Sequence, residues 1–269
     1  MKNLDMTVLP ALQAELASAT NQLLATAASL SDADIAAPSL LPGWTRGHVL
    51  AHLAQNADSH LNLLTWARTG VKVPQYASVE ARAAAIEEAA ARPAARHLAG
   101  LEEGAARLSA AVRDLPPERW SAPVEGMRPP PHPAWYLLVR RIREIGLHHV
   151  DLAAGYGPAE WPEAFVLREL HDCRACWPRD HSAIGEIVLR AASGEIVDRW
   201  PDLGRGPAVE GAPADMLAWL TGRSSGARVT LVPVGQPCTS GGPGLPEPPP
   251  WLTMPAPADL PATPPEGYP

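Results

Sequence analysis

Apolar residues recur at helical spacing through the first 158 positions of the chain. Four stretches carry this pattern, and they cover residues 4–29, 45–66, 78–115 and 134–156. Thr45 and Ser78 stand where the N-caps of two of these helices are expected, and Pro93 is expected to divide or kink the third stretch. Four long helices joined by loops predict a four-helix bundle.

The pattern changes in the second half of the chain. β-Branched residues alternate over 183–192 and 195–200, on either side of a Ser-Gly turn, which predicts a hairpin. Two further helices, the second starting near Pro213, and two further short strands are expected around this hairpin. The fold class is therefore α+β, with the bundle in residues 1–158, a small α+β domain in 159–240 and a proline-rich C-terminal segment in 241–269.

The C-terminal segment is set apart by its prolines. Of the 31 prolines in the chain, 11 fall in residues 241–269. Such a sequence forms no helix or strand of its own, although Trp251 and Leu252 could dock as an isolated anchor. The last part of the segment, residues 253–269, is expected to be disordered.

Composition and charge exclude several classes of protein. Hydrophobic residues make up 46% and charged residues 19%, which is ordinary for a globular protein. A net charge of −7 leaves no basic surface to neutralise phosphates, so nucleic acid is excluded as the main partner. Three cysteines are too few for a disulfide framework, and no run of about 18 apolar residues indicates a membrane span. A cytoplasmic protein without a membrane partner is the expectation.

Two pairs of side chains have the spacing of metal ligands. His48 and His52 lie four residues apart in the second helix, and Glu144 and His148 lie four apart in the fourth. Residues at this spacing share one helical face, so each pair can present two ligands toward a common centre. Helical bundles build metal sites from side chains on facing helices. Either pair alone is weak evidence, because chance matches are common in alanine-rich helices.

The environment of Glu144 leaves two explanations open. Ile142 and Ile145 flank this carboxylate, and a charged carboxylate among aliphatic side chains costs several kcal/mol when it is alone. A divalent cation would remove this cost, and so would an inward-turned arginine, from Arg140, Arg141 or Arg143. A second possible metal or redox motif, Cys173-x-x-Cys176, has no second pair and is interpreted as two ordinary thiols.

Three segments resemble a known family. Residues 40–58 (LLPGWTRGHVLAHLAQNAD), 141–155 (RIREIGLHHVDLAAG) and 245–252 (LPEPPPWL) are similar to the mycothiol-dependent maleylpyruvate isomerases, a branch of the DinB-like metal-binding superfamily. The resemblance implies a DinB-like four-helix bundle followed by a small α+β domain. It also implies that zinc is bound by His52, Glu144 and His148.

The same resemblance implies a reaction. Mycothiol would serve as the thiol cosubstrate, and a zinc-activated thiolate would isomerise maleylpyruvate, a small dicarboxylate, to fumarylpyruvate in gentisate-type aromatic catabolism. Arg82 and Arg223 match arginines that could hold the carboxylates of the substrate. Two alternatives stay open at this point. One is a mycothiol S-transferase acting on another electrophile in detoxification or natural-product biosynthesis, and the other is a non-catalytic ligand-binding module.

Overall fold

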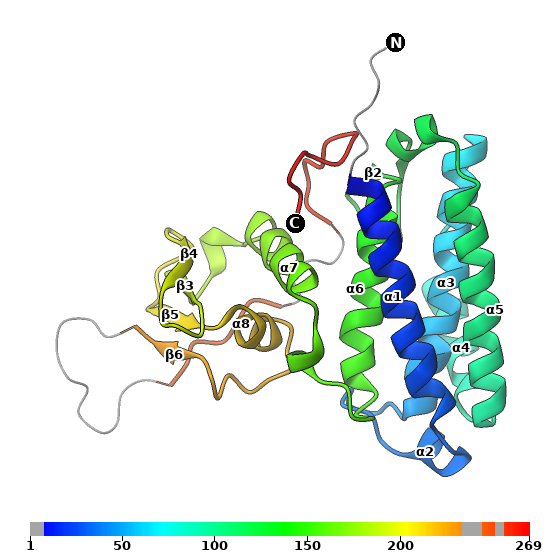
Figure 1. Ribbon diagram of the computed structural model, residues 1–269, viewed down its shortest axis with the longest axis horizontal. Coiled ribbons are helices and arrows are strands. Elements are labelled where there is room, and N and C mark those ends of the chain that lie inside the picture. The colour runs from blue at the N-terminus through cyan, green and yellow to red at the C-terminus, as the bar shows by residue number, and fades with distance from the viewer. Residues whose placement is uncertain (1–7, 233–243, 251–255) are drawn as a thin grey trace. The chain divides into compact units, whose positions relative to one another are not determined.

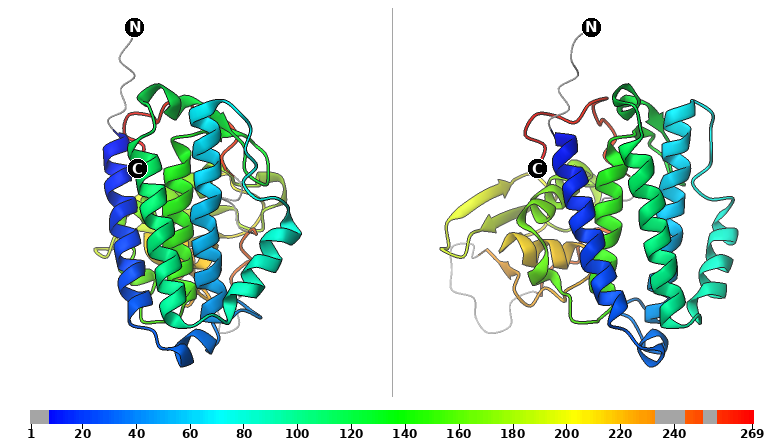
Figure 2. Two further views of the ribbon diagram at one scale, coloured as in Figure 1. Left: turned by 90° about the vertical axis from the view of Figure 1, so that its right-hand side faces the viewer. Right: turned by 45° about the vertical axis from the view of Figure 1, so that its right-hand side comes forward.

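Four long helices lie side by side in the first half of the chain (Figures 1 and 2). A computed structural model describes residues 8–232, 244–250 and 256–269. The four helices are α1 (Val8–Ala28), α3 (Arg46–Thr69), α5 (Ala94–Arg113) and α6 (Tyr136–Asp151). Helices α1 and α3 each contact both α5 and α6, which closes a ring of four helices around one core. The predicted four-helix bundle is confirmed.

The helix ends follow local signals in the sequence. At the start of α3, the Thr45 side chain accepts from the backbone N–H of His48, and the imidazole of His48 accepts from the backbone of Thr45. Gly70 ends the same helix in a left-handed conformation, with φ of 75°. Ser78 caps the short helix α4 (Val79–Ala90), which packs on α3. The predicted break at Pro93 separates α4 from α5.

A short connection leads from α5 into α6. It contains η1 (Pro117–Ser121), β1 (Pro123–Val124) and β2 (His132–Pro133). The short helix α2 (Asp32–Ala36) lies elsewhere, between α1 and α3. Strands β1 and β2 pair antiparallel, so the segment 123–133 folds back on itself beside the start of α6. Val124, directly opposite His132, is fully buried.

The C-terminal residues differ from the disordered tail expected from the sequence. Residues Ala258–Tyr268 group with Met1–Gly157 in one unit of the molecule. The Tyr268 ring meets the Trp135 ring edge-on, with 5.3 Å between centroids, and the Trp135 Nε1–H donates to the Pro261 carbonyl at 3.0 Å. An aromatic contact and a hydrogen bond therefore join this segment to Trp135, the residue before α6. Trp251 and Leu252, the expected anchor, lie outside the described residues.

The second unit, Pro158–Pro257 with Pro269, carries a four-stranded sheet. Its strand order is β4-β3-β5-β6, with β3 antiparallel to β4 and parallel to β5. Its elements are η2 (Pro158–Glu160), α7 (Glu163–Ala175), η3 (Arg179–His181), β3 (Glu186–Arg190), β4 (Ile196–Trp200), β5 (Ala208–Gly211), α8 (Pro213–Leu220) and β6 (Thr230–Leu231). The hairpin around Gly194 and the helix beginning at Pro213 were both predicted. The α+β fold class is confirmed.

The part of the chain that the structure describes contains no helix with the length and apolar character needed to span a membrane.

Candidate metal centre

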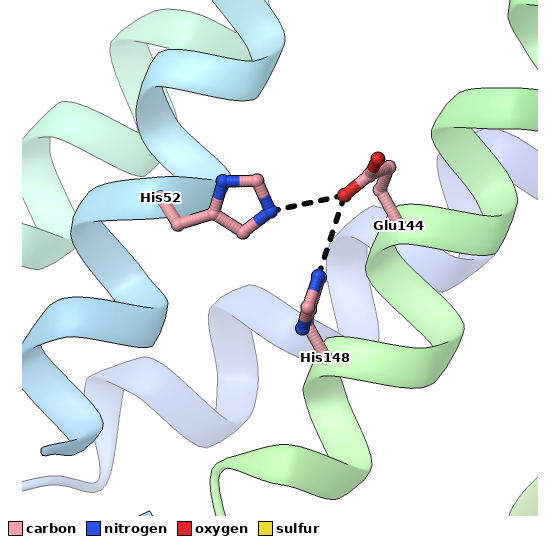
Figure 3. Close-up of side chains that lie close together, drawn as sticks. All are labelled: His52, Glu144 and His148. Atoms are coloured by element: carbon pink, nitrogen blue, oxygen red, sulfur yellow. Dashed lines mark hydrogen bonds and ion pairs between the residues drawn. The ribbon is translucent and has the colours of Figure 1, made fainter. Parts of the chain in front are cut away.

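Three side chains from two facing helices of the bundle converge at one point (Figure 3). His52 comes from the second turn of α3, and Glu144 and His148 lie one turn apart on α6. Oε2 of Glu144 is 3.0 Å from Nε2 of His52 and 3.4 Å from Nε2 of His148. One ligand atom from each residue lies within 4.8 Å of the other two. The structure thus brings together two imidazoles and one carboxylate, the group implied by the family resemblance.

The centre is largely buried. The exposed fractions of His52, Glu144 and His148 are 3%, 7% and 6%. The two imidazole rings meet edge-on at 4.6 Å between centroids, and the Trp44 ring lies 5.9 Å from that of His52. A charge in this environment is weakly solvated, so the side chains themselves decide which groups are ionised.

The carboxylate is ionised even though it is buried. Burial alone would raise the pKa of Glu144, but hydrogen bonds from His148 and His52 outweigh burial and hold that pKa well below 4.5. Burial lowers the pKa of His52 to about 4, so this imidazole is neutral. Burial also opposes the charged form of His148, yet its hydrogen bonds with Asp151 and Glu144 raise its pKa above 6.5. The centre therefore holds an anionic carboxylate between a neutral imidazole and a readily protonated one.

Asp151 orients His148, and its role was not predicted from the sequence. Its Oδ2 accepts a hydrogen bond from Nδ1 of His148 at 2.8 Å, and Asp151 is 1% exposed. A carboxylate on one imidazole nitrogen fixes the ring so that the other nitrogen faces the centre, which is the usual outer support of a metal-binding histidine. The signal was present in the sequence, because an acidic residue three positions after His148 lies on the same helical face.

Arg82 lies beside the centre, and its role in holding a substrate carboxylate stays a prediction. This half-buried residue of α4 donates from Nη2 to Nδ1 of His52 at 3.0 Å. Its guanidinium also lies over the Tyr76 ring, 5.6 Å from the centroid. Nδ1 of His52 is then an acceptor, so the proton of this neutral ring is on Nε2, where it donates to Glu144.

The remaining candidates lie outside this group. His48 shares a helix with His52 but is turned toward the N-cap of α3 and toward Glu87, 3.3 Å away. His149, which follows His148 and was not a candidate ligand, bonds with Thr26 at 2.7 Å. Arg223 belongs to the second unit, where it donates to the Thr221 carbonyl at 2.6 Å, and its role in substrate binding stays a prediction.

The donor set fits a divalent metal ion. Imidazole nitrogen and carboxylate oxygen are ligands of zinc and of several other divalent metals. Three protein ligands are typical of catalytic sites, where a further coordination position stays open for substrate or water. The anionic Glu144 and the carboxylate of Asp151 behind His148 supply the negative charge that a buried cation requires.

A four-helix bundle with a buried histidine and glutamate group between facing helices defines a class of proteins that build ligand and metal sites in the bundle core. Residues 16–153 match the family described as mycothiol maleylpyruvate isomerase N-terminal domain. This range covers more than half of the chain and includes His52, Glu144 and His148. The chain belongs to this family.

Two solved structures are similar to the chain over most of its length. One is the crystal structure of a mycothiol-dependent maleylpyruvate isomerase, 29% identical, with a TM-score of 0.78 and coverage of 90% of this chain and 97% of that chain. The other is the crystal structure of a mycothiol-dependent maleylpyruvate isomerase H52A mutant, with the same identity and coverage and a TM-score of 0.77. None of the curated proteins compared with the chain matches it. The family resemblance of the sequence motifs is confirmed.

Proposed function

We propose that the protein is a zinc- and mycothiol-dependent isomerase that converts maleylpyruvate to fumarylpyruvate. The observation that carries this proposal is the buried group of His52, Glu144 and His148, which lies inside the residues that define the family. Similarity to solved maleylpyruvate isomerases at 29% identity supports the same activity. A cytoplasmic place of action stays a prediction.

The side chains of the centre would hold zinc through Nε2 of both imidazoles and one carboxylate oxygen. The proton on Nε2 of His52 would then move to Nδ1, and the hydrogen bond from Arg82 to Nδ1 would be released. Bound there, zinc supplies a positive charge that lowers the pKa of a nearby thiol and favours the thiolate at neutral pH. Asp151 keeps His148 in the orientation that points Nε2 at the centre. Burial of all three ligands limits access of water to this part of the bundle.

The proposed reaction uses the thiolate of mycothiol as a nucleophile. Its sulfur forms a C–S bond with one carbon of the cis double bond, and the π electron pair moves to the conjugated ketone as an enolate. The former double bond is then a single bond and can rotate. When the enolate collapses, the C=C bond re-forms in the trans geometry and the thiolate leaves, so that no thiol is consumed.

Recognition of the substrate requires cations, because maleylpyruvate carries two carboxylates. Arg82 is beside the centre, and its guanidinium can hold a carboxylate through two parallel N–H donors. Its hydrogen bond to the neutral His52 leaves the positive charge of Arg82 without a carboxylate partner among the described residues. Arg223 of the second unit is proposed as another carboxylate contact.

The decisive experiment follows substrate and thiol together. Zinc-loaded protein is incubated with maleylpyruvate and mycothiol, while fumarylpyruvate and free thiol are quantified. We expect fumarylpyruvate to form with the thiol concentration unchanged, and no product without mycothiol. Loss of one thiol for each substrate consumed would instead identify an S-transferase. Absence of both reactions, in protein that also retains no metal, would identify a non-catalytic module.

A further inference from the structure

Arg140 is a buried cation on the same face of α6 as the centre. Residues 140, 144 and 148 follow one another at intervals of four, so Arg140 lies one helical turn before Glu144. The residue is 6% exposed. Its sequence position suggested an arginine that could neutralise Glu144, but no carboxylate oxygen among the described residues lies within 4.0 Å of the Arg140 guanidinium.

The one hydrogen-bond partner of Arg140 in the described structure is neutral. Nη1 donates to Nε2 of His132 at 3.0 Å, and Nδ1 of His132 donates to the Pro133 carbonyl at 3.0 Å. Burial, followed by the charge of Arg140, lowers the pKa of His132 to about 3. Burial also lowers the pKa of Arg140, but an arginine stays protonated in proteins. Among the described residues, this cation of five N–H donors therefore makes one hydrogen bond, to a neutral acceptor.

Neutral groups fix the position of the guanidinium. A Cβ atom on Gly126 would lie 2.7 Å from Nη1 of Arg140 and 2.8 Å from Oε1 of Gln75, so this loop approaches closely because residue 126 is glycine. Gln75 is held in turn, since its Oε1 accepts from the backbone of Met127 at 2.9 Å and its Nε2 donates to Ser59 at 3.2 Å. The cradle orients the cation without neutralising it.

A second loop, which joins α3 to α4 and contains Gln75 and Tyr76, connects Arg140 with Arg82. Gln75 borders the Arg140 guanidinium, and the next residue, Tyr76, lies under the Arg82 guanidinium. Arg82 bonds to His52 of the centre, and Arg140 stands one turn from Glu144 of the same centre. Two cations without carboxylate partners within 4.0 Å in the described structure thus flank one ligand group. A buried cation without an anionic partner lowers the stability of the fold, and binding of an anion would remove this free-energy cost.

We propose that Arg140 binds the second carboxylate of the substrate, opposite the carboxylate held by Arg82, and that this pair of arginines selects dicarboxylates over monocarboxylates. The inference rests on the proposed function for the identity of the ligand. In this proposal Arg82 and Arg140, which contact the two carboxylates, both belong to the bundle unit. The proposal does not depend on which group Arg223 contacts.

Binding of unreactive probes tests this role without turnover. Heptanedioate has the chain length of maleylpyruvate with a carboxylate at each end, and heptanoate has one carboxylate. Their affinities for the zinc-loaded full chain are measured by calorimetry, together with metal content. We expect Arg140→Gln to reduce the preference for heptanedioate over heptanoate by about tenfold or more, the effect of losing a charge-assisted hydrogen bond. Zinc content should not change.

Two further variants separate charge from position. Arg107→Gln removes an exposed arginine of the same unit and should leave the preference unchanged, which controls for net charge. Gly126→Ala keeps the Arg140 charge but forces its guanidinium to shift, and should lower the preference several-fold while leaving zinc content unchanged. Arg140→Lys should retain part of the preference, because lysine keeps the charge but not the paired donors.

The inference would be overturned if Arg140→Gln kept its preference for heptanedioate over heptanoate within twofold of wild type. It would also be overturned if loss of zinc accounted for the change in preference. The proposed function fails separately. If wild-type protein does not isomerise maleylpyruvate but its preference for heptanedioate depends on Arg140, the anion site stands and the isomerase proposal falls. If isomerisation occurs and the preference does not depend on Arg140, the isomerase proposal stands and the inference falls.

Discussion

Helices α5 and α6 belong to the same bundle but bury very different residues. In α5 a single stripe is buried, and its other residues are half-buried or exposed; the stripe consists of His97, Leu101, Gly104, Leu108 and Val112. In α6 all 16 residues are buried, among them three arginines, Glu144, two histidines and Asp151. Helix α5 has the amphipathic pattern of a structural support. Helix α6 brings charge into the core, which stability alone does not favour.

The charged residues of α6 are tolerated because most have specific partners. Glu144 accepts from two imidazoles, and Nη1 of Arg141 donates both to the Leu53 carbonyl and to Oδ1 of Asn56. Nη2 of Arg143 donates to the Tyr136 hydroxyl at 3.0 Å. Among the described residues, these contacts pair most of the buried polar groups named here, although Nε of Arg141 has no partner, whereas Arg140 has one hydrogen bond, to His132. The comparison suggests that α5 determines stability and α6 determines chemistry, and single substitutions can test this division.

The largest effect is expected from removing a ligand of the centre. His52→Ala deletes one of three metal ligands, so zinc affinity should fall by more than about 100-fold, and isomerisation should be abolished. The loss should exceed that caused by removing a residue that only hydrogen-bonds to a ligand. Zinc is measured by elemental analysis after dialysis, and product by absorbance. Circular dichroism checks that the helices persist. A metal-free His52→Ala protein with full activity would disprove the mechanism.

The next effect is on stability and concerns α5. Leu101 is 3% exposed, and Leu101→Ala would leave a cavity in the core. The free energy of unfolding should fall by about 2–5 kcal/mol, with zinc affinity unchanged. Urea unfolding and a zinc titration measure the two quantities. If Leu101→Ala reduced the free energy of zinc binding as much as the free energy of unfolding, the assignment of stability to α5 and chemistry to α6 would be wrong.

Local features of the fold were predictable from the sequence because they depend on neighbouring residues. The caps at Thr45 and Ser78 and the break at Pro93 are examples. The pairing of Trp135 with Tyr268 was not predictable, since it joins distant positions and replaces an expected disordered tail. Proline content describes local backbone preference and gives no information about a distant docking partner.

The candidate site was predictable only in part. Spacing identified the pair Glu144 and His148, and the apolar residues around His52 indicate that this side chain faces the core. Only the family resemblance joined His52 with Glu144 and His148 in one ligand set. The environment of Arg140 could not be predicted either, because His132 and Gly126 reach it from a loop that carries no periodic pattern.

A smaller effect is expected from the support of the centre. Asp151→Asn removes the charge that orients His148, and zinc affinity should fall by about 10–100-fold while the three ligands remain. Competition with a chelator of known affinity measures this change. The matched control is Asp58→Asn, which removes an exposed carboxylate paired with Arg107 and should alter stability by less than about 1 kcal/mol and zinc affinity not at all. Equal effects of the two variants would exclude a role for Asp151 at the centre.

The smallest and most graded effect is a dependence of zinc affinity on pH. Hydrogen bonds with Asp151 and Glu144 outweigh burial and raise the pKa of His148 above 6.5, and the proton on its Nε2 must leave before a metal binds. His52, with a pKa of about 4, and Glu144, with a pKa well below 4.5, do not change charge between about pH 6 and about pH 8.

One proton should therefore be released in this range, and zinc affinity should increase by up to about tenfold per pH unit until the pKa of His148 is passed. The stability of the metal-free protein should change in the opposite direction. A raised pKa in the folded state stabilises the fold fully below 6.5, and this contribution is lost as pH rises through the folded-state value. Chelator competition and urea unfolding across the same pH range measure both slopes. Because Asp151→Asn removes a hydrogen bond that raises the His148 pKa, it should shift both transitions to lower pH, and unshifted transitions would show that another group titrates.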